Sequence, residues 1–234
     1  MSPNNDPCPE TDRLADMADV KFFGALAAAM THDMKNVLAI INENAGLLGD
    51  LSVKAQKKAT PIDPLKASTI SEKIRKNVTR ADTMMKRFNR FSHSMDHAEE
   101  FVDMEETVML VASLSERIIR RHGGTLTVIP PPVPCRIHAR RFVVLHLIFR
   151  ALDILCCNHA DPASDIQKQM TVRFGSELTR PEICFTRDPG FMIKRDVLFD
   201  SPKDRALLAH VKMKVKMMDA GAGFCLCTAR PEHG

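Results

Sequence analysis

The chain has 234 residues, of which 44% are hydrophobic and 26% charged, a composition typical of a globular protein with one or two cores. No run approaches the roughly 18 apolar residues of a membrane span, and the polar first residues contain no signal-peptide core. We therefore expect a cytoplasmic protein without membrane contact. The net charge of +4 permits acidic partners, but no DNA-docking module is recognisable, so nucleic-acid binding is not expected.

Seven cysteines form no Cys-x-x-Cys pair, and their number is odd. Most of them lie inside apolar runs, such as those at residues 183–185 and 224–227. Buried, reduced thiols are the main expectation, and metal or redox use is the alternative. The cysteines are Cys8, Cys135, Cys156, Cys157, Cys184, Cys225 and Cys227.

The first long helix is predicted to begin near Asp16 or Asp19 and to end near Leu51, after a flexible N-terminus at residues 1–18. Its apolar residues are spaced by threes and fours and stay within roughly 50° of one direction. His32 lies about 180° from Phe23, so it is predicted on the face opposite the apolar stripe. The apolar positions are Phe23, Leu26, Met30, Met34, Val37, Ile41, Ala45 and Leu48.

A turn at residues 60–64 separates this helix from a second one, because its two prolines cannot lie inside a continuing helix. The second apolar stripe runs from Ile70 to Met95, again with spacings of three and four. The two helices are predicted to form an antiparallel hairpin at residues 19–99. One hairpin cannot bury both stripes alone, so we expect two chains to pair into a four-helix bundle as a homodimer.

The rest of the chain, residues 100–234, is predicted to be an α/β sandwich, which makes the whole protein α+β. Strands and helices mix there in a pattern typical of a single sheet covered on one face. Helices are expected at 104–121, 140–157 and 202–218, and strands at 125–129, 170–174, 182–186 and 223–229.

The sequence around the exposed histidine resembles the H-box of sensor histidine kinases. In that family a histidine and an acid are followed by two variable positions and then by Asn or Thr, ahead of apolar residues. His32, Asp33 and Asn36 fit this box one by one. The end of the second helix, at residues 85–92, and the linker at 101–104 are also similar to the family's sequences.

This resemblance covers nearly the whole chain, from about Phe22 to its end. It implies a dimerisation and histidine-phosphotransfer hairpin followed by a GHKL-type, ATP-binding-like domain. A neutral imidazole is a nucleophile near pH 7, which suits His32 to accept a phosphoryl group. Asp33 is expected to orient the imidazole or accept its proton, and Asn36 to hydrogen-bond the incoming group. The expected partner-binding positions around them are Ala28, Lys35 and Ala39.

The ATP-binding-like domain departs from the family pattern in its nucleotide boxes. The two asparagines of the N-box, one of which holds magnesium in the family, correspond here to Arg150 and Ile154. Asp188 and Gly190 of the next box remain, but its second glycine is Met192. The final glycine-rich box has no glycine at the start of the helix predicted from residue 202. The departures predict a degenerate nucleotide site that does not bind ATP.

The leading hypothesis is a homodimeric histidine phosphotransferase that passes a phosphoryl group between receiver-domain aspartates of response regulators through His32. The resemblance implies that magnesium is carried by the receiver, so no metal or cofactor is expected on this chain. Two alternatives stay open: a divergent ATP-dependent histidine kinase, and a noncatalytic scaffold that binds receivers or kinases.

Overall fold

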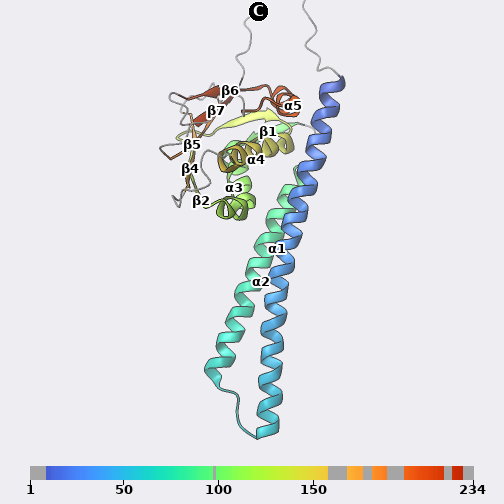
Figure 1. Cartoon of the computed structure of the whole chain (residues 1–234), viewed down its shortest axis with the longest axis vertical. Coiled ribbons are helices and arrows are strands. Elements are labelled where there is room, and N and C mark those ends of the chain that lie inside the picture. Colours follow the sequence, from blue (N-terminus) through green and yellow to red (C-terminus); the bar gives the residue numbers. More distant parts are fainter. Residues whose placement is uncertain are drawn as a thin grey trace, which may run out of the picture. The chain divides into compact units, whose positions relative to one another are not determined.

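The structure, a computed structural model, describes residues 9–96, 99–157, 168–175, 181–188, 198–218 and 223–228. The chain divides into two compact units, Phe23–Ser92 and the combination of Met1–Phe22 with His93–Gly234. The first unit is a helical hairpin and the second contains both helices and strands (Figure 1). This is the α+β organisation that the sequence predicts.

The hairpin is built from α1 (Pro9–Lys58), of which it takes the part from Phe23 onward, and α2 (Pro64–His93). Pro64 is the first residue of α2, where its missing N–H leaves no hydrogen bond unmade. Asp63 precedes it, and its Oδ1 accepts a hydrogen bond from the backbone N–H of Leu65 at 2.9 Å. The predicted turn is confirmed. However, α1 begins earlier than predicted, and residues 9–18, expected to be flexible, belong to it.

Both apolar stripes of the hairpin are only partly buried in the single chain. The rings of Phe23 and Phe91 stack with their centroids 5.5 Å apart. Other buried side chains of the hairpin are Leu26, Met30, Val37 and Ile70. Large apolar side chains of the hairpin that remain exposed, of which only Val78 and Met85 belong to the predicted stripes, are Leu38, Ile40, Leu47, Val53, Leu65, Val78 and Met85. A second copy of the hairpin would give these side chains a surface to pack on.

The second unit carries a five-stranded sheet and a two-stranded sheet within the described residues. The order of the larger sheet is β2-β4-β5-β7-β6, with β2 parallel to β4 and all other pairs antiparallel. The elements are β1 (Glu100–Asp103), α3 (Met104–Arg121), β2 (Gly124–Val128), β3 (Arg136–Ala139), α4 (Arg141–Cys157), β4 (Lys168–Phe174), β5 (Glu182–Arg187), α5 (Pro202–His210), β6 (Met213–Met217) and β7 (Gly223–Thr228).

Most predicted elements of this unit are confirmed, including the buried helix α4 and the hairpin of β4 and β5. The single helix expected at 202–218 was wrong. α5 ends at His210, Lys212 takes a left-handed φ of 53°, and β6 follows. The reason is the alternation of apolar and lysine residues after residue 212, which matches the two-residue period of a strand. The short strands β1 and β3 were not predicted.

The start of α1 packs on α4 inside the second unit. The ring of Phe22 stacks on the imidazole of His146 at 4.4 Å and also contacts the rings of Phe142 and Phe149. The buried carboxylate of Asp19 lies 2.7 Å from Nδ1 of His146. These contacts anchor the part of α1 around Asp19 and Phe22 on α4.

One cysteine prediction needs correction. Cys184 and Cys225 face each other across β5 and β7 and form a disulfide, whereas all cysteines were expected to be reduced. Cys135 and Cys156 are buried thiols, as expected, and Cys227 is a partly exposed thiol. Cys8 lies outside the described residues, as does the side chain of Cys157. Among the described helices, none is both long and apolar enough for a bilayer crossing.

Candidate functional site

His32 and its two polar neighbours form a compact group on α1. The side chain of His32 is 60% exposed, so the predicted exposure is confirmed. Oδ1 of Asp33 lies 3.4 Å from Nδ1 of His32, and Nδ2 of Asn36 lies 3.3 Å from the same ring nitrogen. The helix brings the three together, because one residue and four residues along a helix are positions within side-chain reach.

The two contacts at Nδ1 correspond to the two tautomers of a neutral imidazole. A proton on Nδ1 can be donated to the Asp33 carboxylate, and this tautomer carries its lone pair on Nε2. In the other tautomer Nδ1 holds the lone pair and accepts a hydrogen bond from the Asn36 amide. Asp33 therefore favours the form in which Nε2 of His32 is the nucleophilic atom.

The surface around this group is made of small and basic residues. Ala28, Lys35 and Ala39, the expected partner-binding positions, are all exposed. On an ideal helix, Ala28, Asn36 and Ala39 lie within about 40° of the direction of His32. The imidazole thus stands on a face with little side-chain bulk, which an approaching protein surface can contact closely.

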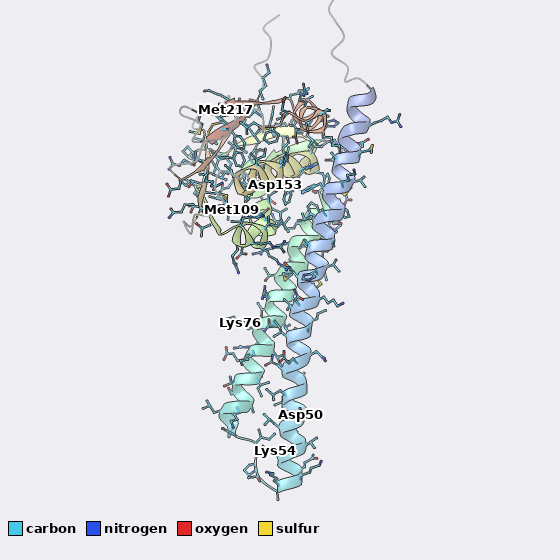
Figure 2. The ribbon with its side chains drawn as sticks, viewed as in Figure 1. Asp50, Lys54, Lys76, Met109, Asp153 and Met217 are labelled. Atoms are coloured by element: carbon cyan, nitrogen blue, oxygen red, sulfur yellow. A yellow bond between two sulfur atoms is a disulfide. The ribbon has the colours of Figure 1, made fainter. Side chains whose placement is uncertain are left out.

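Some of the basic residues of α2 form ion pairs with acidic residues of the same helix. Lys86 lies 2.8 Å from Asp82, and this contact raises the pKa of the Lys86 ammonium above its usual value. Arg75 pairs with Glu72 at 3.2 Å. Lys76 is exposed on the same helix (Figure 2). Solvated ion pairs of this kind contribute little to stability, so these residues form a polar helix face.

In the second unit, Arg150 occupies one of the two positions that were matched to the N-box asparagines of the resembled family. Its Nη1 lies 2.8 Å from Oδ2 of Asp153, which Figure 2 labels on α4, and its Nε lies 3.2 Å from Oδ1 of Asp204. Asp204 is 6% exposed. Magnesium binds to carboxylate oxygens, but here the negative charges of both carboxylates are already neutralised by the guanidinium between them. These three side chains therefore do not fit a magnesium site.

Of the other predicted nucleotide-site residues, the structure describes Ile154 and Asp188. Ile154 is a buried apolar side chain on α4, which offers no ligand atom. Asp188 is exposed, and its backbone N–H donates to the carbonyl of Gln169 at 2.9 Å. Gly190 lies outside the described residues.

The N-terminus of α5 is capped by the side chain of Ser201. The Oγ of Ser201 accepts a hydrogen bond from the backbone N–H of Asp204 at 3.1 Å, and Pro202 has no N–H to offer. The N–H groups that bind phosphate at a helix start are therefore partly used or missing here. Sequence reasoning did not identify Asp204 as a site residue, since its partner Arg150 is 54 positions away along the chain.

A shallow groove of about 460 Å³ lies elsewhere on the second unit, between α3 and β2. Its lining includes Met109, Ile119 and Leu126 and a single ion pair, that of Glu116 with Arg120. Arg150, Ile154 and Asp188 do not line it. The groove is thus not lined by those predicted nucleotide residues that lie in the described part of the chain.

No protein-family model matches the chain, and no curated protein matches its sequence. Solved structures of histidine kinases resemble it weakly. The histidine kinase AdeS of Acinetobacter baumannii is 10% identical, with a TM-score of 0.42, and the match covers 79% of this chain and 92% of that chain. The cytoplasmic segment of histidine kinase QseC is 13% identical, with a TM-score of 0.41 and coverages of 68% and 93%.

Histidine kinase ThkA, solved in complex with the response regulator TrrA, is 13% identical with a TM-score of 0.43. That match covers 95% of this chain and 66% of that chain. Because identities and TM-scores this low do not carry function from one protein to another, we base the functional proposal on the chain's own residues.

Proposed function

We propose that this chain is a histidine phosphotransferase of a two-component phosphorelay. His32 takes a phosphoryl group from the aspartyl phosphate of one response-regulator receiver domain and passes it to the aspartate of another. The observation that carries the proposal is the group at His32, in which an exposed imidazole has Asp33 and Asn36 at one ring nitrogen. Its agreement with the H-box residue by residue supports the same reading.

The transfer follows from the tautomer that Asp33 favours. Nε2 of His32 attacks phosphorus, the N–P bond forms, and the P–O bond to the receiver's aspartate breaks with release of its carboxylate. The proton on Nδ1 stays shared with the Asp33 carboxylate, which stabilises the positive charge that develops on the ring. The phosphohistidine then reacts in the reverse sense with the aspartate of the second receiver.

In this proposal the chain acts without ATP. The guanidinium of Arg150 is paired with Asp153 and Asp204, and Ile154 has no ligand atom, so neither side chain suits a nucleotide-bound magnesium ion. Magnesium would instead be held by the receiver, and this chain contributes no metal ligand to the transfer.

The working form is proposed to be a homodimer. Exposed apolar side chains such as Leu47 on α1 and Val78 on α2 lie on the hairpin, where pairing with a second hairpin would bury them in a four-helix bundle. His32 is exposed, and Ala28, Lys35 and Ala39 around it would receive an acidic receiver surface.

The test is transfer from receiver domains of the source genome, each labelled with ³²P from acetyl phosphate. We expect acid-labile label on the wild-type chain and on His93→Ala, but none on His32→Ala. His93 is a matched control, because it is an exposed helical histidine with Nδ1 2.7 Å from Asp96. Labelling of His32 by γ-labelled ATP would favour the kinase alternative, and receiver binding without any transfer would favour the scaffold.

A further inference from the structure

We propose that the large sheet binds Zn²⁺ between side chains of β5 and β7 when the disulfide between these two strands is reduced. The ligands are the carboxylate of Glu182 and the thiolates of Cys184 and Cys225. Their ligand atoms all lie within 4.8 Å of one another. The proposal is independent of the phosphotransfer function, because it involves neither the hairpin unit nor the residues at Arg150.

The strand register places a fourth ligand on the same face. Glu182 is directly opposite Cys227, and Cys184 is directly opposite Cys225, two residues further along each strand. Side chains two residues apart on a strand point to the same face, so these four form a square on adjacent strands. The residues between them, Ile183 and Leu226, are buried on the other face.

This ligand set matches the preference of zinc. Thiolates select thiophilic cations, and zinc takes three thiolates and one further ligand in a tetrahedral arrangement. Glu182 and Cys184 are partly exposed, so a metal ion can reach them from solvent. The Sγ of Cys227 lies 3.6 Å from the carbonyl oxygen of Lys214, so in the proposed metal-bound state this side chain changes to another χ1 rotamer to bring its sulfur to the metal ion.

Neighbouring strands carry positive charges in register with the cysteines. Arg173 of β4 is opposite Cys184, and Lys216 of β6 is opposite Cys225. Both cations are exposed, and positive charge beside a thiol stabilises its thiolate, the form that binds metal.

The disulfide and the metal site are two states of the same cysteine pair. Dithiothreitol breaks the S–S bond by supplying two electrons and two protons, and it becomes its own cyclic disulfide. Zinc then displaces the protons of the resulting thiols as it binds. Oxidation of the pair removes two ligands, so binding is expected only in the reduced protein.

The experiment is anaerobic titration of the reduced, desalted chain with Zn²⁺ against a chromophoric chelator, with Co²⁺ absorption as a second readout of thiolate ligation. We expect one metal ion per wild-type chain and a thiolate-to-cobalt charge-transfer band. Cys184→Ser and Cys225→Ser should lose both signals. Glu182→Gln and Cys227→Ser should weaken binding by at least about tenfold. Even residues that only contact a metal ligand change the metal affinity by about 10- to 100-fold when they are replaced.

Cys135→Ser is the control, because Cys135 is a buried thiol away from this face and its loss should leave the zinc affinity unchanged. Circular dichroism of each variant separates loss of a ligand from loss of the fold. The proposal is overturned if reduced wild type binds zinc no more tightly than Cys184→Ser, or if the oxidised protein binds as well as the reduced one.

Discussion

The guanidinium of Arg150 on α4 pairs with the buried carboxylate of Asp204 on α5, with 3.2 Å between Nε and Oδ1. The two residues are 54 positions apart in the sequence, so this pair links two helices of the second unit. The pair therefore stabilises the packing of α5 on α4.

Replacing Arg150 with alanine should therefore destabilise the protein. It leaves the Asp204 carboxylate buried without its cationic partner, which is expected to lower the free energy of unfolding by about 1 to 3 kcal/mol. Urea unfolding followed by circular dichroism measures this change. Arg120→Ala is the control, because its pair with Glu116 is exposed on α3 and should contribute no more than about 1 kcal/mol. Equal effects of the two variants would contradict the assignment.

Asp33→Asn should slow phosphotransfer without unfolding the hairpin. The neutral amide no longer stabilises the positive charge on the imidazole, and loss of one such electrostatic stabiliser costs about 10²- to 10³-fold in rate. Rapid-quench measurement of transfer from a labelled receiver gives the rate. Asp50→Asn changes an exposed carboxylate of the same helix (Figure 2) and should leave the rate unchanged. An unaltered rate in Asp33→Asn would remove Asp33 from the mechanism.

Phe22→Ala should destabilise the second unit strongly. The Phe22 ring is 6% exposed and packs on the side chains of His146 and Phe142, so its removal leaves a cavity. The expected loss is about 3 to 5 kcal/mol in the free energy of unfolding. Met17→Ala, at a side chain 55% exposed on the same helix, should change it by less than about 0.5 kcal/mol. A small effect of Phe22→Ala would show that the start of α1 is not anchored on α4.

Cys135 should make stability fall with rising pH. Burial, with a further contribution from the charge of Asp103, raises the pKa of the Cys135 thiol above its usual 9.0. The unfolded chain therefore releases this proton at lower pH than the folded chain, so unfolding becomes more favourable as pH rises above about 9. Urea unfolding at about pH 8 and about pH 10 should give a steeper loss for wild type than for Cys135→Ala. Equal losses would contradict this role.

The local features of the molecule could be predicted from the sequence. The group at His32 depends only on spacings of one and four within a helix, so the pattern was sufficient to place Asp33 and Asn36 beside the imidazole. The strands β4 and β5 were found because their apolar residues alternate, and α4 because its apolar run is too long for a strand.

Features that depend on tertiary contacts could not be predicted. The pairing of Arg150 with Asp204 and of Cys184 with Cys225 is set by how distant elements pack, which no local pattern contains. The strands β1 and β3 have four residues each, too few for an alternation to be distinctive. The packing of Phe22 of α1 on His146 of α4 is also a long-range contact that no local pattern contains.

The most direct test of phosphotransfer through His32 is to locate the phosphate on the chain after reaction with a phosphorylated receiver and no ATP. ³¹P NMR of the wild-type chain should give a phosphohistidine resonance, and peptide mapping should place the phosphate on His32. The resonance should disappear when a second, unphosphorylated receiver is added, because the group moves to its aspartate. A phosphate on any other residue, or a resonance that persists in His32→Ala, would contradict the proposed function.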